Sequence, residues 1–152
     1  MSDTIKRTAV VTGGNRGLGA ASAKALLAAG HNVVAIYIGR VDDAHAFKKE
    51  TGIDVYKCDV SHFAECREVF GAIEKKYGTI DILVNNADGP APGDFRDWTR
   101  DDWISALDTM MLSHIEMMRL TVDGMMARGF GRIVNIVSRS VKIPQIELGL
   151  SN

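Results

Sequence analysis

The chain has 152 residues, of which 46% are hydrophobic and 24% are charged, with a net charge of −1 and a sequence pI of about 6.4. This balance fits one globular domain over residues 1–152, and the lack of a basic excess argues against nucleic acid and anionic membranes as partners. Because no apolar run approaches the ~20 residues that span a bilayer and no signal-peptide pattern opens the chain, we expect a cytoplasmic protein without membrane association.

The first predicted element is a strand over residues 8–11, which is short, apolar and rich in β-branched residues. A glycine-rich segment follows at 12–19, and apolar residues at helical spacing then predict a helix over 18–29. The glycines therefore lie at a turn from a strand into a helix. Gly13 and Gly17 can adopt backbone angles closed to other residues, and a helix start favours a bound phosphate. A glycine turn without any ligand is the alternative interpretation.

The remaining elements alternate between strands and helices. Ser61 is predicted to cap the third helix, which Gly78 ends, and Thr99 with Asp102 forms a capping box before the last helix. Such alternation indicates an α/β fold with a parallel sheet covered by helices on both faces. The predicted strands after the first are 32–37, 53–57, 80–84 and 132–137, and the later helices are 42–51, 62–77 and 101–128.

The segment from Thr12 to Gly19 has the pattern Thr-Gly-x-x-x-Gly-x-Gly. It resembles the fingerprint of the short-chain dehydrogenase/reductase family. The resemblance implies a Rossmann-type doubly wound sheet with strand order 3-2-1-4-5, incomplete relative to the family's seven strands. It also implies a nicotinamide dinucleotide cofactor held by residues of this turn, namely Gly13, Asn15, Arg16, Gly17, Leu18 and Gly19.

Three further segments resemble motifs of the same family. Asp59 and Val60 match a pair that contacts adenine, although an aspartate before a helix is also a common cap. The sequence Asn85-Asn86-Ala87-Asp88 is similar to the family's Asn-Asn-Ala-Gly, with Asp88 in place of glycine, so Asn86 and Ala87 are predicted cofactor contacts. Residues 131–138 resemble the signature around the fifth strand.

The end of the second predicted strand bears on the choice of cofactor. An acidic residue there binds the ribose of NAD, and this chain has Tyr37 instead. Arg16 and Arg40 could both pair with a 2′-phosphate. Solvated surface arginines are the alternative, but we expect NADP rather than NAD.

The family's catalytic set of Ser, Tyr, Lys and Asn is present here only in part. Ser138 matches the serine, whereas Met110 takes the place of the asparagine and no tyrosine follows Tyr77. Two explanations remain open together: a fragment truncated at its C-terminus, and an atypical subgroup resembling 3-oxoacyl-carrier-protein reductases. We therefore expect an NAD(P)-dependent oxidoreductase of carbonyl or hydroxyl substrates. The alternatives are a degenerate or truncated dinucleotide-binding domain without catalysis, and a partner-binding subunit.

The long helix predicted over 101–128 carries methionines on two adjacent stripes. In the family this helix forms a subunit interface, which implies a homo-oligomer, while methionines that fill core gaps are the alternative. Cys58 and Cys66 could form a disulfide, but a reduced protein is the interpretation we favour. No metal site is expected, because the histidines lack ligand spacing.

Overall fold

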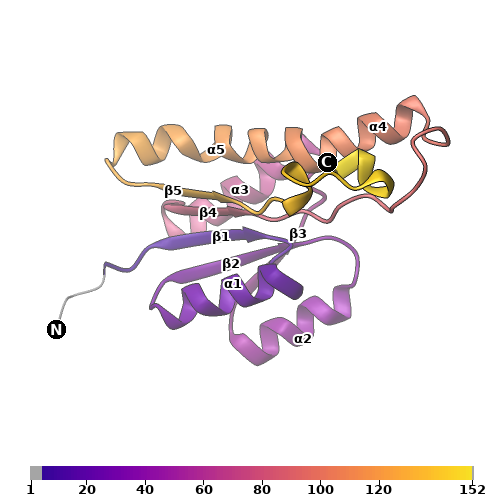
Figure 1. Cartoon of the computed structure of the whole chain (residues 1–152). Helices are drawn as coiled ribbons and strands as arrows, with labels where there is room; N and C mark the ends of the chain where they lie inside the picture. Colours follow the sequence, from indigo (N-terminus) through magenta and orange to yellow (C-terminus); the bar gives the residue numbers. More distant parts are fainter. Residues whose placement is uncertain (1–4, 152) are drawn as a thin grey trace.

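The computed structural model describes residues 5–151, and five parallel strands form one sheet in the order β3-β2-β1-β4-β5 (Figure 1). This is the order that the family resemblance implies. The strands are β1 (Thr8–Thr12), β2 (Asn32–Tyr37), β3 (Asp54–Lys57), β4 (Ile82–Asn85) and β5 (Arg132–Asn135).

Helices cover both faces of the sheet. In Figure 1, α1 and α2 lie on one side of the sheet, and α3, α4 and α5 lie on the other. The helices are α1 (Gly17–Ala28), α2 (Val41–Thr51), α3 (Phe63–Tyr77), α4 (Arg100–Leu107) and α5 (Ser113–Ala127), with a π-helical turn η1 (Asp108–Leu112) and two short 3₁₀ segments, η2 (Arg139–Val141) and η3 (Ile146–Ser151).

The strand β1 shows how the sheet divides the core. Val10 packs with Met117 of α5 on one face, while Val11 packs with Ala23 of α1 on the other face. All five residues of β1 are buried. A central strand of a parallel sheet is covered on both faces, which is why its three middle residues are all apolar rather than alternating with polar ones.

Several predicted boundaries are corrected by the structure. Ser61 is not the cap of α3: the helix begins at Phe63 with His62 as its flanking residue, and Ser61 instead bonds to Asp59. The long helix predicted over 101–128 is interrupted at η1. The fifth strand ends at Asn135 rather than at residue 137. The capping box of Thr99 and Asp102 is confirmed.

The two cysteines are both buried and free, with 3.7 Å between their sulfur atoms. The structure thus holds the two thiols in contact without a disulfide bond, and the reduced state stays a prediction. Within residues 5–151, no helix is long and apolar enough to cross a membrane, and no group of three acidic, histidine or cysteine side chains could hold a metal ion.

Candidate functional site

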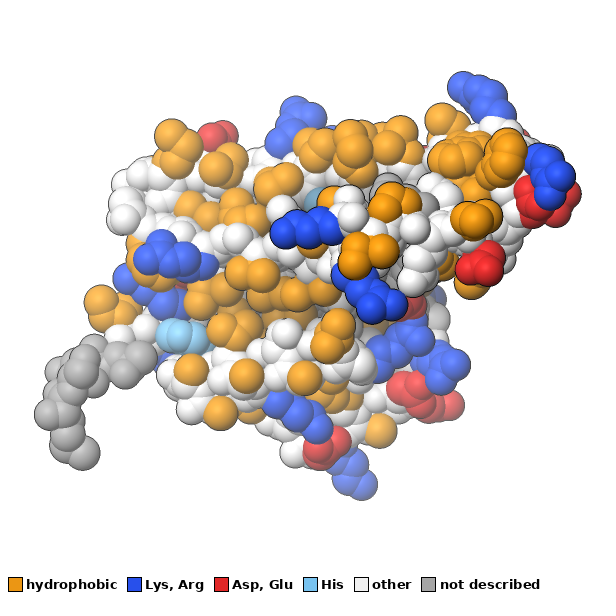
Figure 2. All heavy atoms as spheres, viewed as in Figure 1, with side chains coloured by type: hydrophobic (Ala, Val, Ile, Leu, Met, Phe, Trp, Pro, Cys, Tyr) orange, Lys and Arg blue, Asp and Glu red, His pale blue; other side chains and the backbone are white. Residues whose placement is uncertain are grey.

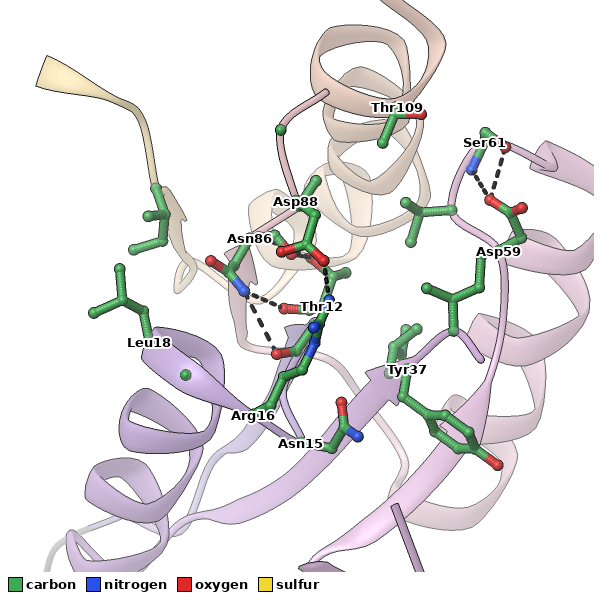
Figure 3. Close-up of a pocket in the computed structure, with 18 of the residues that line it drawn as sticks. Thr12, Asn15, Arg16, Leu18, Tyr37, Asp59, Ser61, Asn86, Asp88 and Thr109 are labelled. Atoms are coloured by element: carbon green, nitrogen blue, oxygen red, sulfur yellow. Dashed lines mark hydrogen bonds and ion pairs between the residues drawn. The ribbon is translucent and has the colours of Figure 1, made fainter. Parts of the chain in front are cut away.

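A cleft of about 790 Å³ opens at the carboxyl ends of the parallel strands (Figure 3). Its walls come from the turns after β1, β2, β3 and β4, from the helical segment around η1 and from the chain after β5. In an open α/β sheet this end is where ligands bind, because loops on either side of the strand-order reversal diverge there. Of the predicted site residues, the lining includes Gly13, Asn15, Arg16, Gly17, Leu18, Tyr37, Asp59, Val60, Asn86, Ala87 and Ser138.

The turn into α1 gives the cleft its anion-binding character. Gly13 and Gly17 both have positive φ, at 58° and 52°, which lets the chain turn sharply into the helix. Arg16 is the flanking residue of α1 but provides no side-chain cap, and the first turn holds no acidic side chain. The first backbone N–H groups of α1 therefore keep their capacity to bind a phosphate, and the helix dipole favours one there.

Gly19 has a different role from the glycines before it. It does not line the cleft, but a Cβ atom at this position would lie 2.1 Å from the carbonyl oxygen of Gly13. The absence of a side chain at Gly19 thus allows α1 to pack against the turn. The sequence predicts this residue among the cofactor contacts, and the structure assigns it to the packing beneath them.

Asn86 fastens the glycine turn to the end of β4. Its backbone N–H donates to Thr12 Oγ1 at 2.8 Å, and Thr12 Oγ1 donates to the carbonyl oxygen of Asn86 at 3.1 Å. The Asn86 amide group also donates to the carbonyl oxygen of Thr12 at 3.2 Å. Asn85 donates in turn to Asn135 at 2.8 Å and so joins β4 to β5. Asn85 and Asn86 at the end of β4 therefore link the turn after β1 to β4 and β5 by hydrogen bonds.

Tyr37 ends β2 and Asp59 follows β3, and both residues line the cleft. The residue at this strand end is Tyr37 rather than an aspartate or glutamate, and its side chain is buried. Asp59 Oδ1 accepts hydrogen bonds from the backbone N–H and the hydroxyl of Ser61, at 2.9 and 2.7 Å. These bonds fix the turn from which Asp59 faces the cleft.

A buried thiol pair supports this turn from below. The Cys66 thiol lies 3.5 Å from the carbonyl oxygen of Val60 and 3.8 Å from that of Asp59. A hydrogen bond with Cys66 and burial raise the pKa of the Cys58 thiol, which keeps it protonated at neutral pH. The Cys58 thiol is thus a packed, neutral group rather than a nucleophile.

The charged side chains that line the cleft are Arg16, Asp59 and Asp88, which come from three different loops. Arg16, on the turn after β1, forms an ion pair with Asp88, on the loop after β4 (Figure 3). No described residue other than glycine has positive φ, so Asp88 occupies the family's glycine position without a left-handed backbone. Arg40 does not line the cleft and lies 3.5 Å from Asp43, with 73% of its side chain exposed.

Ser138 is brought to the cleft by the segment that follows β5. Its hydroxyl oxygen accepts from the backbone N–H of Ser140 at 3.1 Å and from the Ser140 hydroxyl at 2.8 Å. Met110 lies beside the cleft, in a smaller adjoining pocket of about 350 Å³.

Some lining residues are not predicted from the sequence. Ser105 and Thr109 both reach the cleft from one side of the helical segment, and their spacing of four residues is a signal that could have found them. The sequence identifies Thr12 only as the first residue of the glycine fingerprint and does not predict the hydrogen bond between its hydroxyl and Asn86. Asp88 stands out only as a departure from the family motif.

Comparison with known proteins agrees with this geometry. The profile of the family described as short chain dehydrogenase matches residues 7–149, so the chain belongs to that family. It is 46% identical over 134 residues to the acetoacetyl-CoA reductase of Shinella zoogloeoides, and 44% identical over 134 residues to that of Rhizobium meliloti. These alignments cover 88% of this chain and 56% of each relative, so the chain spans little more than half of their length.

Solved structures give the same answer for the fold. An actinorhodin polyketide ketoreductase crystallised with NADPH is similar with a TM-score of 0.89 and 28% identity, over 99% of this chain and 60% of that one. YwfH, an NADPH-dependent reductase of bacilysin biosynthesis, has a TM-score of 0.89 and 27% identity, over 96% of this chain and 60% of its own.

Proposed function

We propose that this chain binds NADPH in the cleft and that its fold serves the reduction of a 3-oxoacyl thioester such as acetoacetyl-CoA. The observation that carries the proposal is the start of α1, which faces the cleft with neither a side-chain cap nor an acidic first turn. A pyrophosphate fits these N–H groups. The acetoacetyl-CoA reductases to which the chain is 46% and 44% identical support the substrate class.

The preference for NADPH over NADH rests on charge at the end of β2. Tyr37 stands where a carboxylate would bind the ribose hydroxyls of NADH and repel a 2′-phosphate. Arg16 lines the cleft and can pair with that phosphate. Arg40, at the exposed start of α2, is a second predicted contact that would have to turn away from Asp43.

The bound cofactor would supply the hydride, and the chain's own groups would orient the substrate. Ser138 lines the cleft, and its hydroxyl can donate a hydrogen bond to the substrate carbonyl oxygen. The rest of the family's catalytic set is not found in this chain: Met110 stands in the position of the family's asparagine, and no tyrosine follows Tyr77 in the sequence given.

The replacement of the asparagine by Met110 and the missing tyrosine favour a second candidate function, a dinucleotide-binding domain without catalysis of its own. Both candidates require cofactor binding, and they differ only in hydride transfer.

We further propose a cytoplasmic location and a homo-oligomer formed through the helical segment 100–127. Exposed apolar side chains along this segment, such as Trp103 and Met111, support the oligomer.

Titration of NADPH and NADH, followed by nicotinamide fluorescence, tests the binding proposal. NADPH should bind more tightly, and Arg16→Gln and Arg40→Ala should each narrow the difference between the two cofactors. Arg100→Gln is the matched control, because it removes a cation from an exposed helix start outside the cleft. Equal affinities, or a preference for NADH, would contradict the proposal.

A further inference from the structure

The cleft is poor in positive charge for a site that would hold a dinucleotide. Among the residues that line it, Arg16 is the one basic side chain, and Asp59 and Asp88 are acidic. A dinucleotide with a 2′-phosphate brings several negative charges. The state of Arg16 therefore decides much of the electrostatic attraction that the cleft offers.

Arg16 is already engaged by an anion of the chain itself. Its guanidinium pairs with the carboxylate of Asp88 across the opening between the turn after β1 and the loop after β4 (Figure 3). The two side chains are 53% and 77% exposed, so the pair faces solvent and can open. Exposed pairs of this kind hold together weakly, and a doubly charged phosphate competes well for a guanidinium.

We propose that Asp88 is a specificity-determining residue: it competes with the 2′-phosphate of the cofactor for Arg16, and thereby lowers the preference of this cleft for NADPH over NADH. The inference rests on the proposed function. It assigns a role to the aspartate that replaces glycine in the Asn-Asn-Ala-Gly motif. The inference also predicts the sign of the change in NADPH affinity: removal of the Asp88 carboxylate should release Arg16 and strengthen NADPH binding.

Two other roles for Asp88 predict different results. If Asp88 held Arg16 in the posture that receives the phosphate, its removal would weaken NADPH binding. If Asp88 merely repelled the anionic cofactor, its removal would strengthen binding by the same factor whether or not Arg16 were present. Competition alone makes the effect of Asp88 depend on Arg16.

A double-mutant cycle separates these roles. NADPH and NADH are titrated calorimetrically at low salt against the full chain, Asp88→Asn, Arg16→Gln and the double variant. Asp88→Asn should raise the affinity for NADPH about two- to fivefold, the range expected for release of an exposed ion pair, and should change that for NADH much less. In the Arg16→Gln background, the same substitution should leave NADPH affinity nearly unchanged.

The matched control is Asp97→Asn, which removes the same charge from an exposed position of the same loop without touching the cleft. It should leave both affinities unchanged, and circular dichroism confirms that all variants are folded. The inference is overturned if Asp88→Asn weakens NADPH binding, leaves it unchanged, helps NADH equally, or has the same effect in the Arg16→Gln background. If the full chain prefers NADPH and the cycle shows no coupling, this inference alone fails. If none of the four proteins binds either cofactor, the proposed function fails with it.

Discussion

Asp54, the first residue of β3, is the centre of a polar cluster beneath the sheet edge. Its carboxylate accepts from Lys76 and Tyr77 of α3 and pairs with Lys48 of α2 at 2.9 Å. Only 14% of the Asp54 side chain is exposed. The hydrogen bond from Lys76, followed by those from Tyr77 and Lys48, holds the pKa of Asp54 well below its usual range. Burial, with the hydrogen bond to Asp54, raises the pKa of Tyr77 to about 12.

These shifts predict how stability depends on pH. The folded pKa of Asp54 is lower than its unfolded value of about 3.9, so the unfolded chain takes up the proton first as the pH falls. The contribution of Asp54 is therefore present above about pH 5 and is lost in acid. The folded pKa of Tyr77 is higher than its unfolded value of about 10, so its contribution is present below that pH and is lost towards pH 12.

The variant Asp54→Asn tests the acid side of this curve. It should lose about 1–2 kcal/mol of unfolding free energy at pH 7, because the lysines lose a charged acceptor. Its stability should also fall less steeply than that of the parent between pH 5 and 3, as measured by urea unfolding. Asp123→Asn, at an exposed position of α5, is the control and should follow the parent curve. Parallel acid limbs for Asp54→Asn and the parent would refute the assignment.

At the scale of elements, the turn from β1 into α1 depends on a close approach that only glycine permits. A Cβ atom on Gly19 would lie 2.1 Å from the carbonyl oxygen of Gly13. Because that oxygen belongs to the backbone, it cannot rotate out of the way as the end of a flexible side chain could. Gly19→Ala should therefore cost about 1–3 kcal/mol of stability through overpacking, and should weaken NADPH binding by shifting the turn.

The matched control lies in α3. Gly71 is a helical glycine, and a Cβ atom added there would have no heavy atom of another segment within 4 Å, so Gly71→Ala should stabilise the chain by about 0.5–1 kcal/mol. Thermal unfolding and cofactor titration of both variants measure the two effects. A Gly19→Ala protein as stable as the parent and with unaltered NADPH affinity would show that the turn is not constrained in this way.

How much of the elements could be predicted depends on how local their causes are. The strand β1 and the turn after it follow from an apolar run and from glycines, and the sequence predicts both at nearly their observed bounds. The predicted start of α3 is wrong because Ser61 is drawn to the carboxylate of Asp59, a competition that helix propensity alone does not contain. The pairing of Arg16 with Asp88 could not be predicted because it joins two loops that are distant in the sequence.

At the scale of the whole molecule, we expect cofactor binding without efficient proton donation from this chain. The glycine turn, Asn86 and Ser138 meet at one cleft, whereas Met110 cannot donate a proton and Tyr77 lies on α3, outside the cleft lining. Because members of a catalytic unit act together, loss of several of them costs orders of magnitude in rate. We therefore expect NADPH oxidation with acetoacetyl-CoA to stay at background for this 152-residue chain.

Stopped-flow absorbance at cofactor-saturating concentrations makes that measurement, and NADPH fluorescence in the same samples confirms that the cofactor is bound. Turnover above background that disappears in Ser138→Ala would contradict the prediction. It would also show that a group other than the family's usual tyrosine supplies the proton, which would favour the reductase over the non-catalytic binding domain.

The outer side of the sheet at β5 bears on how whole molecules meet. Within residues 5–151, β5 pairs with β4 alone and stands at the end of the strand order. Val134 on β5 is 46% exposed, and Val137, just beyond it, is 72% exposed. In the space-filling view, hydrophobic side chains gather across the middle of the face that includes this part of the sheet (Figure 2). An open strand edge with apolar neighbours recruits strands from other molecules.

We therefore expect the 152-residue chain to self-associate at micromolar concentration, and Val134→Lys to reduce that association, because a lysine on an edge strand opposes pairing with another strand. Light scattering after size-exclusion chromatography measures the mass of both proteins. Ile5→Lys is the matched control, since Ile5 is 66% exposed but precedes β1, and it adds the same charge away from the β5 edge. If the parent chain were a stable monomer, the edge would not recruit a partner. If Ile5→Lys reduced self-association as much as Val134→Lys does, net charge rather than the β5 edge would control self-association. A reduction by Val134→Lys alone would place the contact at β5.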